Sequence, residues 1–141
     1  MKAVVLEKPG ELRAVSMDPP RPPEAGEALV RVHRVGVCGT DLHAFRGTQP
    51  YFNYPRIVGH ELGVEILALG GDGSGLAVGD LCAVEPSIHC CQCIACRRGR
   101  GNCCTDLKVL GVHLDGGLRE QIVVPIRNLH KSTRLAPEQL A

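Results

Sequence analysis

The most informative stretch of this sequence is Cys90-Cys91-Gln92-Cys93-Ile94-Ala95-Cys96, followed by Cys103-Cys104. Two residues separate Cys90 from Cys93, and two separate Cys93 from Cys96. This spacing lets successive thiolates converge on one ion from a tight loop, and four sulfurs at about 2.3 Å around Zn²⁺ form a closed tetrahedron. The spacing predicts a structural zinc site whose fourth ligand is Cys103 or Cys104.

Two other interpretations of these cysteines stay open at this point. They could be free thiols, or they could hold an iron–sulfur cluster, which also uses four cysteines. Cys91 lies too close to Cys93 to chelate the same ion, and His89 is not expected to be a ligand. A zinc site with four protein ligands has no open position, so it would hold the loop in shape and perform no chemistry.

The chain as a whole is composed like one globular domain. Its 141 residues include 17 glycines and 10 prolines, which indicates many short strands joined by turns. The apolar start Met1–Leu6 is too short for a secretory segment, so the cytoplasm is the expected location. Eight cysteines in a cytoplasmic chain favour metal binding or catalysis over a disulfide framework.

Charge excludes two classes of partner. The net charge is +1, from 16 basic and 15 acidic residues, so the chain has no electrostatic footprint for nucleic acid or for an anionic membrane. The basic run Arg97, Arg98 and Arg100 is interpreted as a solvated loop. No apolar run approaches the roughly 18 residues of a membrane span.

Hydrophobic alternation predicts a mainly β domain. The expected strands are Ala3–Leu6, Leu12–Val15, Leu29–Val37, Gly63–Leu69, Leu81–Val84 and Leu118–Val124. The segment 8–11 predicts a hairpin turn and the glycine-rich segment 70–75 a flexible turn. Short helices are expected at 38–45, with Thr40 or Asp41 near the start, and from Pro137 onward.

A second constellation combines two motifs that are weak when taken separately. Cys38-Gly39-Thr40-Asp41-Leu42-His43 follows one expected strand, and Gly59-His60-Glu61 precedes another. A lone cysteine after a strand is usually a small buried hydrophobe, and a lone histidine is usually hydrogen-bonded without a catalytic role. Together the motifs supply a thiolate, an imidazole and a carboxylate, which suits zinc with an open position.

The same motifs suggest roles for neighbouring polar side chains. Asp41 could accept a hydrogen bond from the second ring nitrogen of His60 and so orient the ring. Thr40 and His43 could carry a proton from a bound alcohol towards solvent.

The order of motifs resembles the medium-chain zinc-dependent alcohol dehydrogenases, particularly the sorbitol and threonine dehydrogenase-like branch. The matching segments cover nearly the whole chain: Met1–Val5, Val35–Asp41, Val58–Glu61, Val78–Asp80, Val84–Pro86, Cys90–Cys104 and Asp115–Glu120. The resemblance implies that residues 1–141 form a GroES-like catalytic domain, a partly open β-barrel with short helices and a zinc-binding loop.

The resemblance also implies roles residue by residue. Cys38 and His60 match catalytic zinc ligands, and Glu61 matches a neighbouring carboxylate that ligates zinc in the sorbitol dehydrogenase-like branch. Thr40 matches the hydroxyl that bonds the alcohol oxygen, Asp41 the partner of the zinc histidine, and His43 a proton-relay residue. The structural zinc ligands matched are Cys90, Cys93, Cys96 and Cys104. The family usually has glycine at position 91, and Cys103 is an additional thiol.

The family's cofactor-binding half is not visible in this sequence. No G-x-G-x-x-G follows a strand, and the segment 71–75 is interpreted as a turn. A Rossmann domain and the remaining catalytic ligand are therefore expected beyond residue 141 in a full-length enzyme. We expect NAD(P) to bind only that full-length enzyme, and we expect the 141-residue chain alone to be inactive.

The implied function is that of the zinc-binding portion of an NAD(P)-dependent alcohol or polyol dehydrogenase, in which a zinc-bound small-molecule alcohol transfers a hydride. The alternative is a stand-alone zinc-binding or interaction module without redox activity, and a co-chaperonin subunit fits the barrel but not the metal sites. The segment 49–55 carries three of the four aromatic residues and either borders the substrate pocket or packs. Family members suggest a homo-oligomer.

Overall fold

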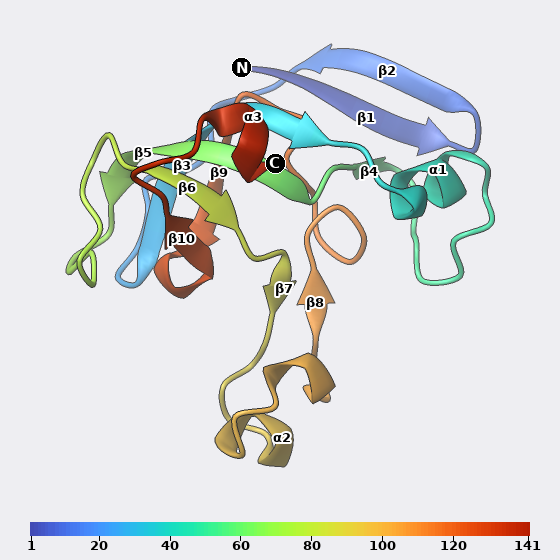
Figure 1. Ribbon diagram of the computed structural model, residues 1–141. Coiled ribbons are helices and arrows are strands. Elements are labelled where there is room, and N and C mark those ends of the chain that lie inside the picture. The colour runs from blue at the N-terminus through green and yellow to red at the C-terminus, as the bar shows by residue number, and fades with distance from the viewer.

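The computed structural model describes residues 1–141 and confirms the mainly β architecture. Figure 1 shows a body of strands from which one lobe projects. The strands form sheets of five, three and two strands, and these sheets do not close on one another. The body is therefore a partly open barrel, as expected.

The five-stranded sheet brings the two halves of the second constellation together. Its order is β10-β6-β5-β3-β9. The strands are β3 (Glu27–Gly36), β5 (Glu61–Leu69), β6 (Leu81–Val84), β9 (Gln121–Pro125) and β10 (Leu129–Lys131). β3 and β5 pair antiparallel, and the last pair of their ladder is Gly36 with Glu61. Because Cys38 follows β3 and His60 precedes β5, this register places both residues at the same end of the sheet.

The main hydrophobic core lies against this sheet. Its twelve buried residues are Ala28, Val30, Leu62, Val64, Ile66, Cys82, Val84, Leu110, Ile122, Val124, Ile126 and Leu129. Each buried Val, Leu or Ile side chain contributes about 1.5–3 kcal/mol relative to an exposed one. Burial also raises the pKa of the Cys82 thiol to about 11, so this cysteine stays protonated and serves as a packing residue.

The three-stranded sheet contains the expected N-terminal hairpin. Its order is β2-β1-β4, with β1 (Lys2–Lys8), β2 (Glu11–Ser16) and β4 (Arg56–Ile57). The expected strand 118–124 is corrected here, because β9 begins only at Gln121. The three residues before it turn towards β1, where the N–H of Val4 donates to Leu118 O and the N–H of Glu120 donates to Lys2 O.

The projecting lobe carries the cysteine loop (Figure 1). It consists of the two-stranded sheet β7 (Ser87–Ile88) and β8 (Lys108–Val109) with α2 (Ile94–Arg97) and η1 (Gly101–Cys103). No residue between Val84 and Leu110 is buried. Hydrophobic burial therefore cannot hold the lobe in shape, and another interaction must do so.

Three further elements complete the fold. They are α1 (Gly39–Phe45), η2 (Ile126–Asn128) and α3 (Pro137–Leu140). The expected helix start at Pro137 is confirmed. α3 packs on β5 at Gly63, where a Cβ atom would lie 2.2 Å from Pro137 O, so only glycine allows this contact. None of the helices is long and apolar enough to traverse a lipid bilayer.

Candidate functional site

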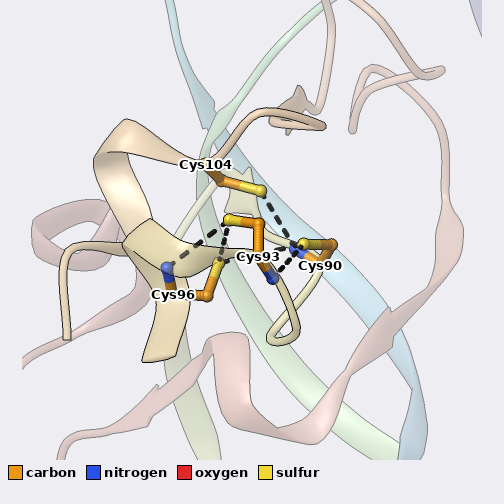
Figure 2. Close-up of side chains that lie close together, drawn as sticks. All are labelled: Cys90, Cys93, Cys96 and Cys104. Carbon is orange, nitrogen blue, oxygen red and sulfur yellow. Dashed lines mark hydrogen bonds between the residues drawn. The ribbon is translucent and has the colours of Figure 1, made fainter. Parts of the chain in front are cut away.

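Four cysteine side chains of the lobe converge on one point. Figure 2 shows Cys90, Cys93, Cys96 and Cys104 with their sulfurs turned towards one another. All four Sγ atoms lie within 4.8 Å of each other. The Sγ atom of Cys96 lies 3.4 Å from that of Cys93 and 3.9 Å from that of Cys90.

The backbone of the lobe is arranged to favour thiolates at this point. The N–H groups of Cys93 and Cys96 donate to the sulfurs of Cys90 and Cys93, at 3.4 Å and 3.5 Å. Donors from Cys96 and Thr105 lower the pKa of Cys93 to about 5. Desolvation by burial, reinforced by the neighbouring thiols, raises the pKa of Cys96 to about 12. Four thiolates held this close together would repel one another, so a bound cation would favour the fully deprotonated cluster.

The donor set fits zinc. Four thiolates at about 2.3 Å from a tetrahedral Zn²⁺ ion lie about 3.8 Å apart, which is close to the observed sulfur separations. All eight cysteines are free, and a disulfide would need sulfurs only about 2.05 Å apart. A divalent cation would balance charges that the four sulfurs cannot otherwise hold together.

The remaining cysteines near the loop lie outside the group. Cys91 and Cys103 are exposed, and neither belongs to the four-sulfur cluster. Of the two candidates for the fourth position, the structure places Cys104 with the other three. Its sulfur accepts hydrogen bonds from the N–H groups of Cys90 and Asp106, both at 3.3 Å. His89 is not part of the group.

The second group lies where β3 ends and β5 begins. Cys38, Asp41 and His60 each offer a ligand atom within 4.8 Å of the others. Cys38 Sγ lies 3.0 Å from His60 Nε2. Zinc bound to both atoms would hold them roughly 3.6 Å apart, so a movement of a few tenths of an ångström admits the ion.

Asp41 holds the backbone at Cys38 and at Gly59, the residue before His60. Its Oδ2 accepts the N–H of Cys38 at 3.1 Å, and its Oδ1 accepts the N–H of Gly59 at 3.3 Å. Asp41 and Cys38 thereby form a capping box at the start of α1, with Cys38 as the N-cap residue. The pattern Cys38-x-x-Asp41 could have revealed this cap, but cysteine is not among the usual N-cap residues.

His60 is the imidazole of this group and is largely buried. Its Nδ1 is buried without a hydrogen-bond partner and lies 3.7 Å from Asp41 Oδ1. The side chains of His60 and Asp41 are only 12% and 10% exposed. A cation at Nε2 would place the ring hydrogen on Nδ1, facing the carboxylate, which is the arrangement common around metal-bound histidines.

Glu61 is not part of this group. Its carboxylate lies against Gly36, where Oε2 is 2.6 Å from the position that a Cβ atom would take. The carbonyl carbon of Ala141 lies 3.4 Å from the same position. Glu61 and Ala141 therefore both lie beside Gly36 at the end of β3, two residues before Cys38.

The polar side chains of α1 and the aromatic loop after it differ in their surroundings. Thr40 and His43 are three residues apart on α1, so they share one face of the helix.

Phe52 is buried against Ala44, and the Tyr54 hydroxyl donates to Ala44 O. These two aromatics of the segment 49–55 therefore pack against α1, while Tyr51 is 71% exposed.

Comparisons with known proteins place this geometry in a family. The model for the alcohol dehydrogenase GroES-like domain matches residues 24–134. L-galactonate-5-dehydrogenase of Escherichia coli K12 is 42% identical over 141 residues, which are all of this chain and 41% of that protein. L-threonine 3-dehydrogenase of Pyrococcus horikoshii is 38% identical over 145 residues, with the same coverage.

A solved structure agrees with these sequence matches. The alcohol dehydrogenase RspB from Escherichia coli CFT073, complexed with NADH, has a TM-score of 0.87 and 40% identity over 99% of this chain and 41% of that one. The chain thus spans about two fifths of the length of its relatives. The resemblance drawn from the motifs is confirmed: the chain belongs to the alcohol dehydrogenase GroES-like domain family, within the zinc-dependent medium-chain dehydrogenases.

Proposed function

We propose that residues 1–141 form the zinc-holding catalytic domain of an NAD(P)-dependent alcohol or polyol dehydrogenase whose Rossmann cofactor domain lies elsewhere in a longer protein. The observation that carries the proposal is the Cys38–Asp41–His60 group with its unpartnered buried nitrogen. A purely structural module would need no second group with a thiol, an imidazole and a carboxylate at the end of its main sheet.

The proposed ligands of the catalytic zinc are Cys38 and His60, with Glu61 as a third. Asp41 is already bonded to two backbone N–H groups, so its role is to orient His60 rather than to bind the metal. Glu61 would have to turn from Gly36 towards Cys38 to reach the ion. The remaining ligand is proposed to come from a part of the longer protein outside residues 1–141.

The chemistry divides between the bound groups and the side chains of this chain. When bound, zinc would act as a Lewis acid that eases loss of the hydroxyl proton, and a nicotinamide coenzyme would provide the hydride acceptor. Thr40 accepts a hydrogen bond from the alcohol and orients its oxygen. His43, one helical turn further along α1, receives the proton and passes it to solvent, which it can reach because it is exposed.

The relatives suggest a class of substrate and coenzyme. Their names specify oxidation at carbon 5 of L-galactonate and carbon 3 of L-threonine, and the RspB structure contains NADH. We propose a small polar substrate with a secondary hydroxyl group and a nicotinamide coenzyme for the longer protein. The second proposed site, Cys90, Cys93, Cys96 and Cys104, holds a structural zinc and fills first, because its ligands all lie within one short loop.

Replacing Cys38 tests the proposed function. In the longer protein, Cys38→Ser should lower kcat/KM for NAD(P)-dependent alcohol oxidation by about 10³-fold or more, because the Lewis acid contributes several kcal/mol of transition-state stabilisation. Zinc at the four-cysteine site should remain. The chain of 141 residues alone should show no such oxidation. Alcohol oxidation that is unaffected by Cys38→Ser would contradict the proposal and favour a zinc module without redox activity.

A further inference from the structure

Helix α1 ends in a backbone motif that brings one more side chain to His43. The C-cap residue is Arg46, and Gly47 follows with a φ of 75°. The N–H of Gly47 donates to Ala44 O at 3.0 Å, and the N–H of Thr48 donates to His43 O at 2.9 Å. These two bonds define a Schellman motif, in which the second residue after the cap lies beside the third-last helical residue.

The position of Thr48 is therefore set by the backbone rather than by its own side chain. Gly47 needs its left-handed conformation, and a Cβ atom there would lie 2.8 Å from Pro9 Cγ. In many Schellman motifs the two flanking side chains make an apolar contact. Here the contact is polar, because the two side chains are an imidazole and a hydroxyl.

Two contacts of the Thr48 hydroxyl define how the ring of His43 is protonated. Thr48 Oγ1 lies 3.0 Å from His43 Nδ1 and 3.3 Å from His43 O. The carbonyl oxygen can only accept, so the hydroxyl donates to it and Oγ1 is left to accept from the ring. Both contacts are hydrogen bonds at the same time only when Nδ1 carries the ring hydrogen.

We propose that Thr48 is a positioning residue that holds neutral His43 in the tautomer with hydrogen on Nδ1 and a lone pair on Nε2. The proposal rests on the proposed function, in which His43 receives the proton of the alcohol. The Nε2 lone pair takes up that proton to give an imidazolium ion. Loss of a proton to water then restores the neutral ring. In the opposite tautomer Nε2 already carries hydrogen and cannot accept.

The tautomer can be measured on the 141-residue chain without coenzyme or substrate. In ¹⁵N-histidine-labelled protein at a pH where the ring is neutral, long-range ¹H–¹⁵N correlation spectra distinguish a nitrogen that carries hydrogen from one that does not. We expect His43 to show a protonated Nδ1 and an unprotonated Nε2. Thr48→Val should shift both ring resonances towards the opposite tautomer, and Thr48→Ser should restore the wild-type pattern.

The chain offers matched controls. His113 Nδ1 accepts the N–H of Val109 at 3.1 Å, so its spectrum should show the opposite tautomer and should not change in any variant. Thr133 is another exposed threonine, and Thr133→Val should leave His43 unchanged. An unchanged His113 pattern also shows that the Thr48 variants remain folded.

A wild-type His43 with hydrogen on Nε2, or a Thr48→Val variant with the wild-type pattern, would overturn the inference. Either result leaves the proposed dehydrogenase function standing, because that function is tested by the Cys38 variant. Conversely, a longer protein that fails to oxidise alcohols would refute the function while the tautomer result still stands.

Discussion

Cys93→Ser should release about one zinc ion per chain and unfold the lobe while the barrel stays folded. Structural zinc contributes about 10–16 kcal/mol of apparent binding free energy in small zinc-finger peptides. The lobe has no buried residue between Val84 and Leu110, so hydrophobic burial contributes little to its stability. Serine still caps α2, because its hydroxyl can accept the N–H of Cys96 as the thiol does. The expected loss is therefore attributable to the metal.

Limited proteolysis and amide hydrogen exchange measure this result. Segments within residues 85–109 should become cleavable and lose protection, while β3 and β5 keep theirs. Cys91→Ser is the matched control, since Cys91 lies in the same loop but outside the sulfur cluster. Equal zinc loss in both variants would mean that Cys93 has no special role and would contradict the assigned ligand set.

Gly116→Ala should destabilise the barrel by at least about 3 kcal/mol, because no side chain fits at that position. A Cβ atom on Gly116 would lie 2.2 Å from Gly59 O and 2.7 Å from both Val58 O and the Cα atom of Gly111. All these neighbours are backbone atoms, which cannot move aside without shifting the segment that leads into His60. The variant should therefore also weaken metal binding at the Cys38–His60 pair.

Gly39→Ala provides the comparison for this substitution. Gly39 begins α1, and nothing lies within 4 Å of the position that its Cβ atom would take. Alanine is favoured over glycine in a helix, so this variant should be neutral or slightly more stable. Thermal unfolding should show a Tm that is lower by roughly 10 °C for Gly116→Ala only. Equal Tm values would show that the backbone around Gly59 leaves room for a methyl group on residue 116.

Local patterns were sufficient to predict the parts of the fold that alternate or turn within a few residues. The hairpin of β1 and β2, the long strands β3 and β5, and the start of α3 follow from such patterns. The short strands β4, β7, β8 and β10 do not, because two or three residues carry no readable alternation. They form where long-range pairing places an otherwise irregular segment beside another strand.

The candidate site, like the fold, is only partly predictable from local sequence patterns. The cysteine spacing alone indicated a zinc loop, but only the folded chain separates Cys104 from Cys103. Cys38 and His60 are 22 residues apart in the sequence, and the pairing of β3 with β5 brings them together. No local sequence pattern predicts the register of that pairing. No local sequence pattern indicates that Glu61 rests against Gly36, or that Thr48 contacts His43.

X-ray absorption spectroscopy of the 141-residue chain loaded with one equivalent of zinc distinguishes the two groups of ligands. We expect this zinc to enter the four-cysteine site in the lobe and to be surrounded by four sulfurs at about 2.3 Å. A first zinc bound by nitrogen or oxygen ligands together with sulfur would contradict it. That result would mean that the Cys38–His60 pair binds first, or that Cys90, Cys93, Cys96 and Cys104 do not form a structural zinc site.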